Sequence, residues 1–260
     1  MRVNGLLSLV AQGRQDEAEV MIEKDPRLLL ERGDVTDGAG RTFTHITALQ
    51  TAVWALDAHM WTMMLPYFDQ INARCSAGDQ LRLLEQTGTA HGRHFDFKPL
   101  LDAYGAYLAR PSAESWCRGV GVAQRALPDH VIQEYTTPDR PFKPVPDFSV
   151  QHGRPGVHGE RGVKWWRTAR YDRGTVGETW GAWRGQEQRA QTCAISIFHF
   201  ESHWAHSQRF TISISRRAAG KEQATLHTLC SQRERDLSAL LAAFSIMPSQ
   251  APESKSPGRR

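Results

Sequence analysis

Residues 46–68, ITALQTAVWALDAHMWTMMLPYF, decide how the first half of this chain is built. Apolar side chains recur in this stretch every three or four residues, which is the period of a helix with one buried face. They are Leu49, Ala52, Val53, Leu56, Met60, Met63 and Met64. Pro66 is expected near the end of the segment, because a proline ring inside a helix clashes with the preceding turn. The stretch predicts buried helix as the framework for its neighbours, with most of its Trp and Met side chains in the core.

The sequence before this stretch predicts another helical pair, at residues 3–12 and 15–24, with Gly13 between the helices. Asp25-Pro26 ends the pair, because the residue before a proline is steered out of the helical conformation. Residues 33–40, GDVTDGAG, are polar and rich in glycine, and they predict a loop. After the central stretch, further helices are predicted at residues 78–87 and 99–108, joined by a loop at residues 90–97.

Both helical regions resemble the ankyrin repeat, in which T-P-L-H-x-A opens the first helix, a glycine ends it and a V-x-x-L-L-like run closes the second. The matching segments are residues 4–10 with Gly13, Ala18, Met21 and Ile22, and residues 47–53 with Trp61, Met64 and Leu65. Leu56 stands where the family has its glycine between the helices. The resemblance implies stacked helical hairpins that hold a partner through the finger at residues 34–44 and the exposed edges of the following helix.

From this finger we assign four residues to partner binding: Asp37, Arg41, Phe43 and His45. A narrower resemblance covers residues 5–148 and rests on GRTFTHITALQTAVWALDAHMWTMML, HGRHFDFKPLLDAY and VGVAQRALPDHVIQEYTTPDRPFKPVPDF. These segments resemble a family of divergent ankyrin-like proteins from intracellular bacterial pathogens, which are presumed to be type IV-secreted effectors. Because that family has no assigned chemistry, the resemblance implies a setting and a binding role and no catalytic residues.

The second half of the chain predicts a smaller α+β part. A short helix is expected at residues 128–135, followed by a proline-rich strap, TTPDRPFKPVPDF, which cannot form a regular helix or a central strand. Residues 193–200 and 209–215 alternate apolar and polar side chains and predict a β-hairpin. After Gly220, an amphipathic helix carries Arg233 on its apolar face, where this side chain must snorkel or find an acid.

Two histidine clusters are candidates for metal chemistry. His199, His203 and His206 would share one face of a helix and could bind zinc, but the flanking alternation favours a hairpin tip and their spacing is not H-E-x-x-H. His91, His94 and Asp96 form a looser group, for which a loop-bracing role is favoured. No nucleophile elbow, phosphate-binding loop or dinucleotide fingerprint is present in the sequence.

Residues 151–189 interleave arginine with tryptophan, a pattern that suits nucleic acid or phospholipid as well as an ordinary surface. Acidic residues dilute this pattern, and the net charge of +4 is mild, so nucleic acid is not the favoured partner. The four cysteines are scattered and contain no CxxC pair, which indicates buried thiols in a reducing compartment. No apolar run is long enough to suggest a membrane span.

Together these observations predict a mostly α protein, with an ankyrin-like helical hairpin stack at the N-terminus and a smaller α+β C-terminal part containing a β-hairpin. The expected divisions are residues 1–110, the strap region 111–148, the C-terminal region 149–248 and a disordered tail at 249–260. The favoured function is protein–protein binding without a cofactor, by a bacterial effector that is cytoplasmic in the bacterium or secreted into a host cell. The alternatives are an enzyme with a metal at His199, His203 and His206, and an anion-binding protein that uses residues 151–189.

Overall fold

The computed structural model describes residues 2–112, 115–131 and 208–246, and these residues are mostly helical, as predicted. The α-helices are α1 (Arg2–Ala11), α2 (Gln15–Lys24), α3 (Ala48–Trp54), α4 (Ala58–Gln70), α5 (Arg74–Thr87), α6 (Lys98–Ala109), α7 (Gly121–Arg125) and α11 (Gln208–Ala243). A 3-10 helix, η1 (Pro26–Leu30), follows α2, and a π-helix, η2 (Ser115–Val120), precedes α7. Within the described ranges the sheet structure is one antiparallel hairpin of β1 (Gly33–Thr36) and β2 (Thr42–Ile46).

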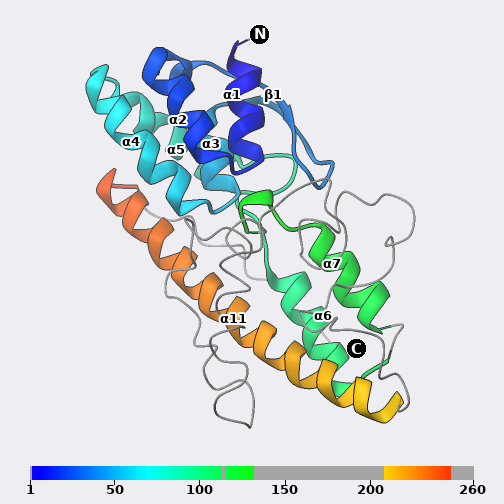
Figure 1. Cartoon of the computed structure of the whole chain (residues 1–260). Coiled ribbons are helices and arrows are strands. Elements are labelled where there is room, and N and C mark those ends of the chain that lie inside the picture. Colours follow the sequence, from blue (N-terminus) through cyan, green and yellow to red (C-terminus); the bar gives the residue numbers. More distant parts are fainter. Residues whose placement is uncertain (1, 113–114, 132–207, 247–260) are drawn as a thin grey trace, which may run out of the picture.

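The first five helices pack together at one end of the molecule (Figure 1). Helix α1 packs against α2 and α3, α2 packs against α4, and α3 packs against both α4 and α5. The predicted pair at residues 3–12 and 15–24 is therefore confirmed as α1 and α2. Strand β1 lies against α1, so the hairpin is attached to the side of this helical group.

The stretch at residues 46–68 forms two helices, separated at Leu56. Thr47 and Gln50 form a capping box at the start of α3, with the Gln50 backbone N–H donating to the Thr47 hydroxyl at 3.2 Å. Leu56 has a φ of 58°, the left-handed conformation that the ankyrin pattern gives to glycine. Asp57 then caps α4 by accepting from the Met60 backbone N–H at 3.0 Å.

Helix α4 continues through Pro66 to Gln70, so this proline lies near the end of the helix, as expected. A proline near the last turn removes one intrahelical hydrogen bond and leaves the earlier turns intact. Phe68, two residues later, is buried, and its packing holds the final turn in helical form despite the missing bond.

The prediction of a loop at residues 33–40 is wrong for its first half, because residues 33–36 form strand β1, whereas residues 37–40 do form a turn. Val35 pairs with Phe43, and both side chains are buried, so apolar burial on one face stabilises a hairpin that its glycine-rich composition hides. A bulge separates the pairs Val35–Phe43 and Gly33–Ile46, and it places His45 in a left-handed conformation with a φ of 53°.

The predicted strand at residues 209–215 is also wrong, because this segment is helical and belongs to α11. In so short a run, a pattern that alternates is also compatible with a helix. Phe210 and Ile214 are four residues apart, which is the spacing of side chains on one helix face. Helix α11 continues through Gly220 as well, at a cost of about 1 kcal/mol for a glycine inside a helix. The predicted partner strand at residues 193–200 lies outside the described residues.

Helix α11 runs along α6 and reaches α4 at its C-terminal end (Figure 1). Its Leu240 and Leu241 join the main core with the first five helices, and its Leu226 and Leu229 join a second cluster with α6. Between these groups Arg233 is only 2% exposed, and its Nη1 lies 3.3 Å from Asp236 Oδ2. The prediction that this arginine finds an acid is confirmed.

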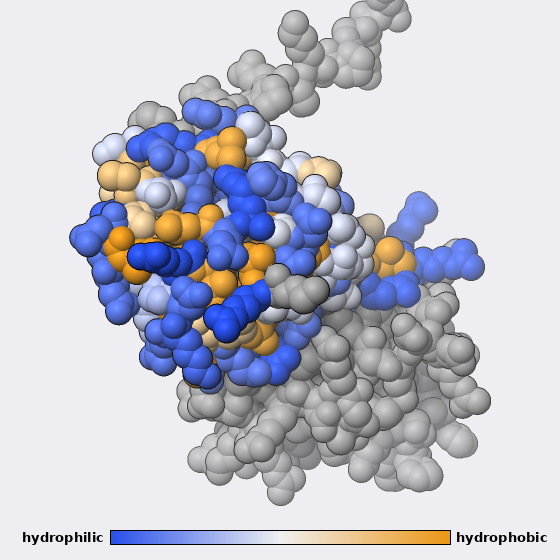
Figure 2. All heavy atoms as spheres, turned by 90° about the horizontal axis from the view of Figure 1, so that it is seen from above, coloured by the Kyte–Doolittle hydropathy of each residue, from blue (hydrophilic) through white to orange (hydrophobic). Residues whose placement is uncertain are grey.

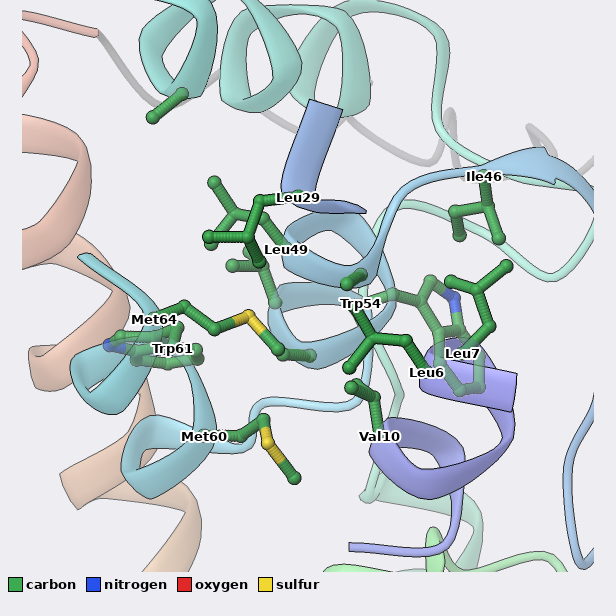
Figure 3. Packing of buried hydrophobic residues seen from close by; sticks show 14 of the residues in the cluster. Leu6, Leu7, Val10, Leu29, Ile46, Leu49, Trp54, Met60, Trp61 and Met64 are labelled. Carbon is green, nitrogen blue, oxygen red and sulfur yellow. The ribbon is translucent and has the colours of Figure 1, made fainter. Parts of the chain in front are cut away.

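The main core is built from the side chains that the central stretch supplies. Trp54, Met60, Trp61 and Met64 are all buried, and Figure 3 shows Trp54 packed beside Leu6 and Leu7 of α1, with the methionines toward the other end of the cluster. Their predicted place in the core is confirmed. Of the described helices, even α11 is too polar to serve as a bilayer span.

The cysteine prediction is corrected in one case. Cys75 is exposed, because it lies on the face of α5 opposite the buried Ala77, Leu81 and Leu84. Cys230 is partly buried, and burial, with a smaller contribution from Glu234, raises the pKa of its thiol to about 12. The side chains of Cys117 and Cys193 lie outside the described part of the structure.

Candidate partner-binding surface

The hairpin turn holds two of the four predicted binding residues in one compact network. Asp37 accepts hydrogen bonds from the backbone N–H groups of Ala39 and Arg41, each at 2.9 Å. Its other carboxylate oxygen lies 2.7 Å from Arg41 Nε and 2.6 Å from Arg41 Nη2. The two side chains are 6% and 16% exposed, so this pair is partly removed from water and serves to shape the turn.

Arg41 also ties the hairpin to other parts of the fold. Its Nη1 donates to the carbonyl of Ala126 at 2.6 Å, and its guanidinium lies over the rings of Trp54 and Phe95 at 4.8 and 5.2 Å. The turn approaches the same region at Gly38, where a Cβ atom would lie 2.3 Å from Asp129 Oδ1. The guanidinium of Arg41 is therefore committed to internal contacts.

The remaining two predicted residues differ sharply in exposure. Phe43 is 3% exposed, and its ring meets Trp54 edge-on at a centroid distance of 4.6 Å. His45 is exposed, its backbone N–H donates to Asp34 Oδ1 at 2.8 Å, and its carbonyl accepts from Arg32 at 2.9 Å. Of the four side chains assigned from sequence, only that of His45 is available to a partner at the surface.

The loop after α5 is braced by two histidines. His91 Nε2 lies 3.0 Å from the carbonyl of Thr42, and His94 contacts both the Val53 carbonyl at 3.3 Å and Glu85 Oε1 at 2.6 Å. This agrees with the loop-bracing role that we favoured over metal binding. In the described ranges, no three His, Cys, Asp or Glu side chains gather closely enough to hold a metal ion.

Two adjoining cavities lie along α5, the larger one beside η1 and the smaller one beside β2, and we call them together the α5 groove. The larger, of about 540 Å³, is lined by Leu30, Arg32, Thr47, Ser76, Asp79, Gln80, Arg82, Leu83 and Gln86. The smaller, of about 240 Å³, is lined by all five β2 residues, by Arg32, Gln50, Leu83 and Leu84, and by residues 87–90. Arg32 and Leu83 line both, so the two cavities adjoin at these side chains.

The α5 groove combines exposed apolar side chains with polar ones. Leu30 and Leu83 are 41% and 38% exposed, and they belong to a group of four large apolar side chains exposed in the described ranges, with Val20 and Val122. Figure 2 shows apolar atoms between hydrophilic residues on the face seen from above, so exposed apolar surface is a feature of this end of the molecule.

Buried polar side chains fix the floor of the α5 groove. The Thr47 hydroxyl donates to Gln80 Oε1 at 2.6 Å, Gln80 Nε2 donates to the Leu29 carbonyl at 3.0 Å, and Gln50 Nε2 donates to the Gln80 carbonyl at 2.9 Å. Because each donor has an acceptor, η1, α3 and α5 are held in fixed relation. The groove is therefore part of the rigid fold.

Sequence reasoning placed the contact on the finger at residues 34–44 and the exposed edges of the following helix, so it reached the β2 side of the α5 groove and missed the α5 side. The signal was present at Leu83, which neighbours the buried Leu81 and Leu84 and falls on the outer face of the predicted helix. The alternative metal site at His199, His203 and His206, and the Arg/Trp-rich residues 151–189, lie outside the described residues.

Comparison with protein-family models matches residues 106–244, more than half of the 260-residue chain, to the CBUA0006 C-terminal domain. The chain belongs to this family. It is also 36% identical over 176 residues to "Uncharacterized protein CBUA0006" from Coxiella burnetii (strain RSA 493 / Nine Mile phase I). That match covers 56% of this chain and 51% of the relative, so the chain spans about half the length of the curated relative it matches. No solved structure matches the chain.

Proposed function

We propose that this chain is a protein-binding module that holds a partner in the α5 groove, in the manner of a divergent ankyrin-like surface. The observation that carries the proposal is the pair of adjoining cavities along α5, which brings two exposed leucines next to Arg32. Rigid grooves that mix apolar side chains with a few fixed polar groups are typical of protein-binding surfaces.

The arrangement of the elements supports an ankyrin-like interpretation. Two helix pairs, α1–α2 and α3–α4, lie side by side, and the β1–β2 hairpin connects them as a finger would. In this interpretation Asp37 and Arg41 act indirectly, by fixing the hairpin against Ala126, while His45 and the β2 backbone line the groove. The proposed contact surface therefore keeps the β2 part of the finger and extends from it to α5.

The similarity to a protein of the bacterium Coxiella burnetii supports the setting that we propose. In this setting the chain is part of a bacterial effector that binds a protein of a host cell. A binding role also fits the described part of the chain, in which the buried polar side chains of the groove, Thr47, Gln50 and Gln80, are engaged in structural hydrogen bonds. Partner identity would then depend on the shape and charge of the groove.

Capture from a eukaryotic lysate with matched variants tests the proposal. Leu83→Asp places a charge in the groove, whereas Val20→Asp makes the same kind of change at an exposed apolar position on α2, outside the groove. Loss of a defined partner with Leu83→Asp and its retention with Val20→Asp are expected, because a single carboxylate in an apolar contact is costly. Equal capture by both variants would contradict the proposal, provided that circular dichroism shows both to be folded.

A further inference from the structure

We propose, building on the function above, that the occupant of the α5 groove is an extended acidic segment of a partner protein. Its backbone would pair with the open edge of β2 at Thr44, and its carboxylate would bind Arg32. This occupant is indicated by three features of the groove: a strand edge, a guanidinium that pairs with no carboxylate of the described residues, and two flanking leucines.

The first of these features is the edge of strand β2 that faces the smaller cavity. Within the described ranges β2 pairs with β1 alone, so its other edge faces the groove, and all five of its residues line the smaller cavity. The Asp37 backbone N–H donates to the Arg41 carbonyl at 3.0 Å, so Asp37 and Arg41 form a hydrogen-bonded pair. Because such pairs alternate along an antiparallel ladder, the next hydrogen-bonded pair is Val35–Phe43. By the alternation of an antiparallel pair, the N–H and C=O of Thr44 then point away from β1 and toward the groove.

Neighbouring backbone groups limit where a new strand can add. The Thr42 carbonyl already accepts from His91, and both backbone groups of His45 are engaged, with Asp34 and with Arg32. The open position on the edge is therefore Thr44, next to Arg32. A peptide that pairs there would run in extended form, as in other cases of strand addition to a sheet edge.

The charge of the groove selects the chemistry of that peptide. In the described part of the chain no carboxylate pairs with Arg32, and its hydrogen bonds to the His45 carbonyl and to Gln50 use Nη1 alone. Among the described residues Nε and Nη2 have no acceptor, which leaves them for the forked contact that a guanidinium makes with a carboxylate. The groove's other exposed ions, Arg82 and Asp79, pair with each other at 2.6 Å and so largely cancel.

The leucines supply the remaining contacts. Leu30 and Leu83 are both partly exposed where they line the larger cavity, beside Arg32. Because side chains of an extended peptide alternate between two faces, one face can place apolar side chains on these leucines. We therefore expect an acidic residue among apolar or β-branched residues.

Selection from a random twelve-residue phage-display library against the whole chain tests this assignment. Peptides with an enriched Asp or Glu are expected, and a synthetic copy should bind about tenfold or more weakly to Arg32→Gln. Replacing the peptide's acid by its amide should cause a similar loss without altering the protein. N-methylation at alternate backbone nitrogens should abolish binding in one register and spare it in the other, because only one set of N–H groups faces β2.

Each result separates the two proposals. Selected peptides that lose binding with Leu83→Asp but show no acid preference and ignore Arg32→Gln would overturn this inference and leave the proposed function standing. Insensitivity to N-methylation in both registers would likewise overturn pairing with β2. If no selected peptide depends on Leu83 for binding, no peptide occupies the groove and this inference fails. It also fails if the chain forms a dimer that Leu83→Asp dissociates, because a second copy of the chain then occupies the groove.

Discussion

Arg41 and Ala126 are 85 residues apart in the chain, yet the Arg41 Nη1 atom donates a hydrogen bond of 2.6 Å to the Ala126 carbonyl. The same guanidinium pairs with Asp37 in the hairpin turn and covers the ring of Trp54. One side chain therefore connects the hairpin, the helical core and the segment after α7, a segment that falls inside the family match.

Removing this connection should destabilise the whole fold. Arg41→Ala leaves the nearly buried Asp37 carboxylate without its cation, and we expect a loss of about 2–4 kcal/mol in the free energy of unfolding. Arg41→Lys keeps the charge but cannot make the forked contacts, so its loss should be smaller. Urea denaturation followed by circular dichroism measures both, and equal stability of Arg41→Ala and the wild type would contradict this role.

The finger residues should separate into structural and exposed ones. Phe43→Ala removes a buried ring that packs on Trp54 and should cost about 3–5 kcal/mol. His45→Ala changes an exposed side chain, and its stability should stay within about 0.5 kcal/mol of the wild type. Thermal melts of the two variants measure these changes in stability. A large loss at His45 with none at Phe43 would reverse the assignment.

Leu56 should tolerate glycine better than alanine. Both substitutions remove a buried side chain, but glycine also relieves the left-handed conformation at φ 58°, which costs other residues about 1–2 kcal/mol. Leu56→Gly should therefore unfold at higher urea concentration than Leu56→Ala, by about 1 kcal/mol in stability. Inside a helix the expected order of stability is the opposite, with alanine more stable than glycine. If Leu56→Ala is the more stable variant, the left-handed strain at this position is absent.

The two described cysteines should differ in reactivity toward iodoacetamide. Only the thiolate reacts, and the raised pKa of Cys230, about 12, keeps it protonated well above neutral pH, so its alkylation should stay slow and increase as the pH approaches that value. Cys75 is exposed and should react readily at pH 8. Peptide mapping by mass spectrometry measures the two sites, with urea-unfolded chain as the control. Equal rates in the folded chain would contradict the burial of Cys230.

The helical framework was predictable because its signals are local. Residues 3–24 and 46–68 show apolar spacing and breaks that indicate helix pairs, and Leu56 stood where the pattern expects a left-handed residue. The errors arose where distant contacts decide the structure. The hairpin at residues 33–46 depends on the burial of Val35 and Phe43 against the helical core, and residues 209–215 continue a long helix. Strand-like alternation in seven residues does not outweigh that continuation.

The candidate site was only partly predictable for the same reason. Sequence analysis selected the hairpin, which does line the α5 groove, but it could not show that Asp37 and Arg41 bind each other or that Phe43 faces inward. The groove itself needs η1, β2 and α5 together, and residues as far apart as Leu30 and Gln86 meet in it only after folding.

Site-specific photo-cross-linking tests the central claim most directly. A benzophenone amino acid at Gln86, which lines the groove, is compared with the same group at Gln70, an exposed glutamine on α4 outside it. In a eukaryotic lysate we predict one defined protein adduct from position 86 and none of the same mass from position 70. The same adducts from both positions, or none from position 86, would contradict binding in the α5 groove.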